Sequence, residues 1–129
     1  METDDALLQE FIRESVDNIA LAEKALAQLA ADPADPKAGT PVFRAVHTLA
    51  GTAGFFGFER LGLLAHEGER FLGPWRDGVP PSLERRNLAA ELLDAIRGAV
   101  SRVAAGGPEG PEDFKALRAR LRTAALAEA

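Results

Sequence analysis

One stretch of the chain combines a histidine with unusually small neighbours. Four positions share one face of a helix because they stand at i, i+3, i+4 and i+7: His47, Ala50, Gly51 and Gly54. Glycine inside a helix costs about 1 kcal/mol relative to alanine, so two glycines in one helix indicate a compensating reason. Either two helices pack closely there, or a partner approaches the bare backbone. An imidazole on such a strip is accessible to a phosphoryl group brought by another protein.

A second histidine is followed by a carboxylate at helical spacing. His66 and Glu69 are three residues apart and therefore share a helix face. If their helix packs antiparallel beside that of His47, Glu69 would accept a hydrogen bond from Nδ1 of His47. This bond would leave Nε2 unprotonated and nucleophilic, as in other sites where a third group orients a histidine. The spacing thus indicates a nucleophile at His47 and an orienting group at Glu69.

The elements that must position these residues are predicted to be helices. Ala, Leu, Glu and Arg dominate, tyrosine is absent, and no alternating apolar pattern indicates a strand. Apolar residues recur at spacings of three and four, and proline or glycine separates the periodic segments. The pattern predicts an all-α fold: an up-down four-helix bundle over about 4–105 and an additional C-terminal fifth helix over about 112–127. The expected bundle helices cover about 4–30, 40–56, 58–75 and 80–105.

Several local signals mark the ends of these helices. Thr40 is an N-cap candidate because proline follows it, and Gly57 fits a turn. Trp75 is expected to cap the rim of the bundle. The segment 106–111, rich in glycine and proline, is expected to be a flexible break before the fifth helix.

Composition and charge exclude several classes of function. The 129 residues are 47% hydrophobic and 27% charged, which is typical of one folded domain. The net charge of −5 argues against nucleic acid or an anionic membrane as the partner, and the absence of cysteine excludes thiolate sites. No apolar run approaches the ~20 residues that span a bilayer, and the N-terminus lacks a secretory pattern. We therefore expect a cytoplasmic domain that is monomeric when isolated.

The stretch from Phe43 to Glu69 resembles a known family. It joins a block His47-Thr-Leu-x-Gly-x-x-Gly54 to a block Leu64-Ala-His-x-x-Glu69. This combination is similar to the histidine phosphotransfer (HPt) motif and, more narrowly, to the N-terminal P1 domain of CheA-type chemotaxis histidine kinases. The resemblance implies a four-helix bundle with a fifth helix.

The resemblance also assigns roles to residues. It implies that His47 is the phospho-acceptor, that Glu69 hydrogen bonds to it and that His66 is a neighbouring residue. Gly51 and Gly54 would be the small positions where a response regulator docks. The expected docking surface also includes Thr48 and Phe55.

One position departs from the family pattern. The family usually has a lysine three residues after the histidine, near the phosphoryl oxygens, whereas this chain has Ala50. The site therefore lacks one cation. Arg44, three residues before His47, is the candidate substitute as a phosphate neighbour. The change bears on transfer rate and choice of kinase more than on the nucleophile.

The expected function is that of a phosphocarrier. His47 would accept a phosphoryl group from ATP bound by the kinase domain of a CheA-type kinase, in cis or in trans, and donate it to the aspartate of a CheY-like response regulator. The chain has no Gly-rich phosphate loop, so we expect no cofactor here, with ATP and Mg²⁺ bound by partner domains. No catalytic activity is expected of this domain alone. It is expected to be part of a protein-histidine kinase, with these residues as its N-terminal fragment.

Two alternatives remain open at this level. An HPt-like bundle without phosphorylation would be an interaction module for receiver domains, and modification of His47 would distinguish the two. The second alternative is a metal site formed by His47, His66 and Glu69, because two histidines and a carboxylate can hold zinc. Their spacing matches no dedicated metal motif, and a metal on Nε2 would block phosphorylation.

Overall fold

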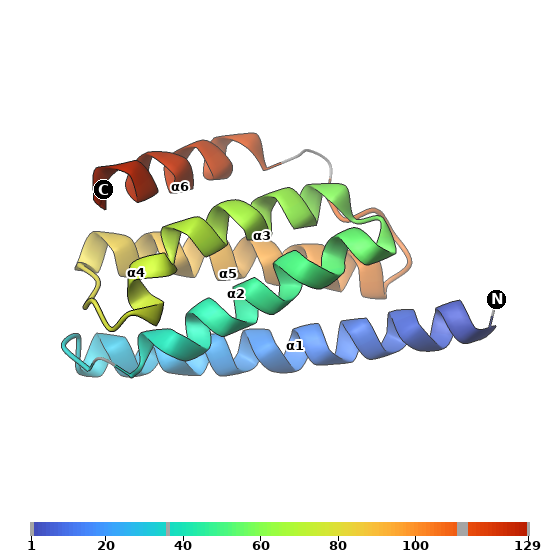
Figure 1. Ribbon diagram of the computed structural model, residues 1–129. Coiled ribbons are helices and arrows are strands. Elements are labelled where there is room, and N and C mark those ends of the chain that lie inside the picture. Colours follow the sequence, from blue (N-terminus) through green and yellow to red (C-terminus); the bar gives the residue numbers. More distant parts are fainter. Residues whose placement is uncertain (1, 36, 111–113, 129) are drawn as a thin grey trace.

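The computed structural model describes residues 2–35, 37–110 and 114–128, and its regular structure there is helical throughout. Helices α1, α2, α3 and α5 alternate in direction and form a bundle, and α6 lies beside α3 on the side away from α1 (Figure 1). This confirms the expected all-α bundle with a fifth helix. The elements are α1 (Glu2–Ala31), α2 (Gly39–Ala53), the 3₁₀ helix η1 (Gly54–Phe56), α3 (Glu59–Phe71), α4 (Gly73–Arg76), α5 (Leu83–Ala104) and α6 (Lys115–Glu128).

The bundle core consists of the apolar faces that the spacing predicts. Residues three and four apart lie on one side of a helix, so each helix buries one stripe against its neighbours. On α3 and α5 the fully or almost fully buried side chains are Leu61, Leu64, Ala65, Phe71, Ala89, Leu92, Leu93, Ile96, Ala99 and Val100. This shared core fixes the rotation of α2 and α3, which carry the candidate site.

The third predicted helix is divided into two. Helix α3 ends at Phe71, and the short α4 follows after Leu72. Pro74 has no backbone N–H and restricts the residue before it, so the helix does not continue unbroken. Trp75 is not on the rim as expected: it is 1% exposed. It lies against the start of α2, where a Cβ on Gly39 would be 3.0 Å from its own Cβ.

Glycine stands at the start of α2 and in the turn that follows η1. The helix begins at Gly39, and its N-cap position, Ala38, offers no side-chain hydrogen bond, so the predicted cap at Thr40 is wrong. After η1, Gly57 adopts a φ of 78°, a left-handed conformation that favours glycine. The chain turns there and returns as α3 beside α2.

The segment expected to be a flexible break is tied to α3. The carboxylate of Glu109 accepts hydrogen bonds from the backbone N–H groups of Arg60 and Leu61, at 2.9 and 3.1 Å. Arg102 in turn donates to the carbonyl oxygen of Glu109 at 2.9 Å. Glu109 thus satisfies free N–H groups at the start of α3, a task that no α3 side chain performs. The predicted start of the fifth helix, at 112, lies outside the described residues.

Helix α6 packs on the bundle. Its Leu121 is fully buried, and Arg122 forms an ion pair with Glu67 of α3 at 2.8 Å. Arg120 pairs with Glu91 of α5 at 2.7 Å, and hydrogen bonds from Arg120 lower the pKa of Glu91. Across the described residues, no helix is both long enough and apolar enough to cross a membrane.

Candidate functional site

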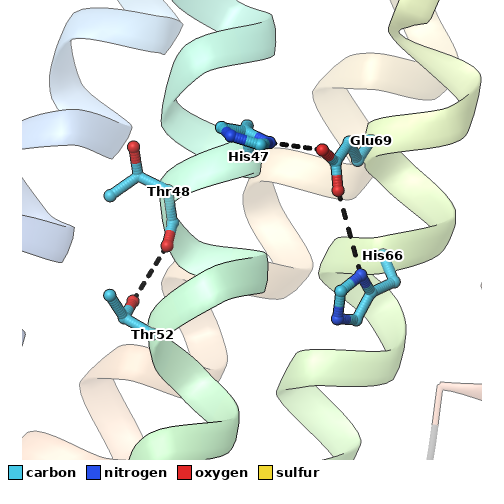
Figure 2. Close-up of polar contacts among 5 residues, drawn as sticks. All are labelled: His47, Thr48, Thr52, His66 and Glu69. Atoms are coloured by element: carbon cyan, nitrogen blue, oxygen red, sulfur yellow. Dashed lines mark hydrogen bonds and ion pairs between the residues drawn. The ribbon is translucent and has the colours of Figure 1, made fainter.

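His47 and Glu69 meet across the interface between α2 and α3. Nδ1 of His47 is hydrogen bonded to Oε1 of Glu69, as Figure 2 shows. An ionised carboxylate only accepts hydrogen bonds, so this contact favours the tautomer with the proton on Nδ1, in which the lone pair of the neutral ring is on Nε2. The side chain of His47 is 62% exposed. The arrangement directs Nδ1 at Glu69 and leaves the imidazole on an open surface.

Glu69 lies between the two histidines of the chain (Figure 2). Its second oxygen, Oε2, is 3.8 Å from Nδ1 of His66, which is too far for a hydrogen bond. His66 therefore interacts with Glu69 by charge when its ring is protonated. The glutamate is 27% exposed, so its partners hold it in a partly shielded position.

A glycine allows α3 to approach closely enough for this contact. A Cβ on Gly68 would lie 2.7 Å from Cδ2 of Leu92 and 3.2 Å from Cγ1 of Val46. At the first distance the buried Leu92 side chain would have to shift, so glycine at this position lets α3 pack closely against α2 and α5. The next residue along α3 is Glu69, which then reaches His47.

A third contact to His47 comes from its own helix. The ring of Phe43 lies 5.7 Å from the imidazole, centroid to centroid, and the two planes are inclined by only 12°. The guanidinium carbon of Arg76, on α4, lies 5.1 Å from the centre of the same phenyl ring. Sequence periodicity places Phe43 in the core, where it is 7% exposed, but does not reveal this stacking. Its i, i+4 spacing from His47 is the one sequence signal for it.

The strip of small residues is only partly as predicted. Ala50 is 5% exposed and belongs to the core, so it does not lie on the open face with His47. Gly51 and Gly54 are exposed, and a Cβ on either would meet no atom within 4 Å. Internal packing therefore does not require these two glycines.

The other predicted docking residues are also on the surface. Thr48 is exposed, and its carbonyl oxygen accepts a hydrogen bond from the hydroxyl of Thr52 at 3.0 Å (Figure 2). Phe55 is 76% exposed, which is unusual for a phenyl ring. Their role in docking stays a prediction.

The predicted cation, Arg44, is not joined to the site. Its side chain is exposed and pairs with no residue in the part of the chain that the structure describes. Its role as a phosphate neighbour also stays a prediction.

The geometry gives no support to a metal site. Within residues 2–35, 37–110 and 114–128, no group of three or more His, Asp or Glu side chains is arranged to hold a metal ion. Glu69 instead directs Oε1 at Nδ1 of His47, and its Oε2 lies 3.8 Å from Nδ1 of His66.

Comparison with known proteins agrees with this arrangement. The family model of the Hpt domain matches residues 6–106. The chain belongs to the Hpt domain family. The Hpt match ends just after α5, so α6 lies beyond it.

Similarity to one protein is more specific than the match to the family model. The chain is 33% identical over 104 residues to the chemotaxis protein CheA of Halobacterium salinarum. This alignment covers 80% of the chain and 16% of that protein, so the chain matches only a small part of its relative's length. The resemblance to the HPt domain of a CheA-type protein is thereby confirmed.

Proposed function

We propose that this Hpt domain is a phosphocarrier of a chemotaxis-type two-component system. His47 accepts the γ-phosphoryl group of ATP held by the kinase domain of a CheA-type kinase. It then donates the group to the aspartate of a CheY-like response regulator. The observation that carries the proposal is the contact of Glu69 with Nδ1 of a largely exposed His47.

The chemistry follows from this contact. The lone pair of Nε2 attacks the γ-phosphorus, an N–P bond forms, and the bond to the bridging oxygen breaks as ADP leaves with its electrons. The ring then carries positive charge, because Nδ1 keeps its proton. The carboxylate of Glu69 stabilises that charge and keeps the ring oriented, in the way that a triad carboxylate supports its histidine.

Partner proteins supply the rest of the site. ATP and Mg²⁺ belong to the kinase domain, and the receiver contributes its aspartate and metal ion, so this domain is the substrate and relay. The exposed face around Gly51 and Gly54, with Thr48 and Phe55, is the surface on which a receiver docks. Bare backbone there lets the partner's active site come within reach of Nε2.

The test is phosphate incorporation from labelled ATP, catalysed by a panel of CheA-type kinase cores. We expect an acid-labile label on the wild-type domain and none on His47→Gln, with helix content unchanged in the variant. His66→Gln removes the only other histidine and still accepts an acid-labile label. Phosphoramidate, a small donor that needs no docking surface, is used in parallel.

Two results would contradict the proposal. Acid-labile label on His47→Gln would exclude His47 as the acceptor. A wild-type domain unlabelled by every core, by phosphoramidate and by back-transfer from a phosphorylated receiver would favour the interaction module. The observation that favours an interaction module as the second candidate is that position 50 is Ala50 and carries no cation.

A further inference from the structure

We propose that Phe43, braced by Arg76, is a positioning residue that fixes the plane of the His47 imidazole for phosphoryl transfer. This inference rests on the proposed phosphocarrier function and deepens it. It concerns how the ring is held, because the hydrogen bond to Glu69 alone does not determine its orientation.

One hydrogen bond leaves the ring a degree of freedom. Glu69 fixes the direction of Nδ1, but the imidazole still tilts about the line from Nδ1 to the carboxylate oxygen. The phenyl ring of Phe43, at 5.7 Å and 12°, restricts this tilt because the two faces lie nearly parallel. Polar and aromatic contacts together therefore define where Nε2 points.

Phe43 is itself held in place. It is 7% exposed, so the bundle core surrounds most of its ring. It precedes His47 by four residues on α2, and a helical side chain leans over the turn N-terminal to it, which brings His47 over Phe43. The contact is thus built into the helix and does not depend on a partner.

Arg76 adds a contact from a second element. Its guanidinium carbon lies 5.1 Å from the centre of the Phe43 ring, within the range of a cation–π interaction. The neighbouring Asp77 accepts a hydrogen bond from Nε of Arg76 at 3.2 Å. The short α4 thereby supports the ring that supports the nucleophile.

Ring orientation matters because the Nε2 lone pair lies in the plane of the imidazole. In-line displacement requires this lone pair to point at the phosphorus, opposite the leaving oxygen. A tilted ring turns the lone pair away and lowers the fraction of reactive encounters. The effect falls on the rate of transfer within the complex, whereas binding of the partner is unaffected.

The experiment compares Phe43→Leu with Phe71→Leu. Both remove a buried phenyl ring, but Phe71 contacts Trp75 instead of His47. When the domain is varied as the substrate of the kinase core, we expect Phe43→Leu to lower kcat about tenfold with little change in the KM for the domain. The variant should also be labelled more slowly by phosphoramidate. Phe71→Leu loses stability and keeps kcat. Phe43→Tyr retains the stacked ring and most of the rate.

A surface variant provides an independent test. Arg76→Ala removes the cation–π contact with Phe43 without opening the core. It is expected to slow phosphoryl uptake about two- to fivefold. Asp77→Asn keeps an oxygen that can accept the hydrogen bond from Nε of Arg76, and is therefore expected to slow uptake less than Arg76→Ala. In Phe43→Leu, the Arg76→Ala change has no further effect, because the ring that it braces is gone.

NMR provides a readout that a merely structural role would not move. The carbon-bound ring protons of His47 should lose the ring-current shift due to Phe43 in Phe43→Leu, while the ¹⁵N signals still report a proton on Nδ1. Loss of this shift with an unchanged kcat would overturn the inference, as would an equal loss of kcat in Phe71→Leu. A wild-type domain without label would instead overturn the proposed function itself.

Discussion

His47 is held by two contacts of different kind, a polar one at Nδ1 and an aromatic one on its ring face. The polar contact decides which nitrogen carries the proton, and the aromatic contact restrains the plane. Neither contact supplies a cation for the phosphoryl oxygens. Position 50 is the place to examine that deficit, because the family usually has lysine there.

We expect Ala50→Lys to speed phosphoryl transfer or to slow hydrolysis of the phosphohistidine, by adding positive charge next to the phosphoryl group. The change also costs stability, about 1 kcal/mol, because the Cβ of residue 50 is buried and the lysine stem must run to the surface. Single-turnover transfer kinetics and chemical denaturation measure the two effects.

Ala50→Met is the matched control, because it adds a side chain of comparable length without charge. It should cost a similar amount of stability and leave both rates unchanged. Equal rates in the lysine and methionine variants would mean that the partner or Arg44 already neutralises the phosphoryl oxygens.

Single residues differed in how far the sequence could place them. Glu69 was predicted as the partner of His47 because helical spacing and an antiparallel neighbour suffice to bring them together. Ala50 was misplaced because it lies about 60° around the helix from His47, at the edge of the strip. Helix packing determines which edge of this strip faces α3, and side-chain rotamers determine whether Phe43 stacks on His47. The spacing of residues in the sequence specifies neither.

The packing of α3 between α2 and α5 depends on one glycine. We expect Gly68→Ala to destabilise the domain by about 1 kcal/mol, since its methyl group would meet buried Leu92 at 2.7 Å. The displaced α3 would also separate Glu69 from His47 and slow transfer. Denaturant unfolding and the labelling assay test both parts.

The same substitution at Gly51 is expected to have the opposite sign. Nothing lies within 4 Å of a Cβ there, so Gly51→Ala should stabilise α2 by about 0.4–1 kcal/mol. Destabilisation by Gly51→Ala, or stabilisation by Gly68→Ala, would contradict this account of the two glycines.

Helix positions were easier to predict than helix ends. Periodic apolar residues indicated every long helix, since burial of one face determines the spacing. The break between α3 and α4 falls inside the segment 58–75 that the sequence predicts as one helix, close to its end. The start of α2 at Gly39 was missed, and the close packing of Trp75 against Gly39 could not be predicted because the two residues are 36 positions apart in the chain.

At the scale of the whole molecule, the chain after α5 is held against α3 by several contacts. Glu109 caps the start of α3, and Arg122 of α6 pairs with Glu67 near its end. The sequence could not predict the cap, because Glu109 and its partners are almost fifty residues apart. The fastened segment stabilises the helix that presents Glu69 to His47.

Helix α6 should therefore contribute to the stability of the bundle through Leu121. We expect Leu121→Ala to lower the free energy of unfolding by about 2–5 kcal/mol, because this side chain of α6 is fully buried. Leu126→Ala makes the same change on the same helix at a side chain that is 70% exposed, and should stay within about 0.5 kcal/mol of wild type. Amide hydrogen exchange should show lost protection in α6 and at the start of α3 for the first variant only. If the two variants proved equally stable, Leu121 would not anchor α6, and the connection from α6 to the helix of Glu69 would have to rest on other contacts, such as the ion pair of Arg122 with Glu67.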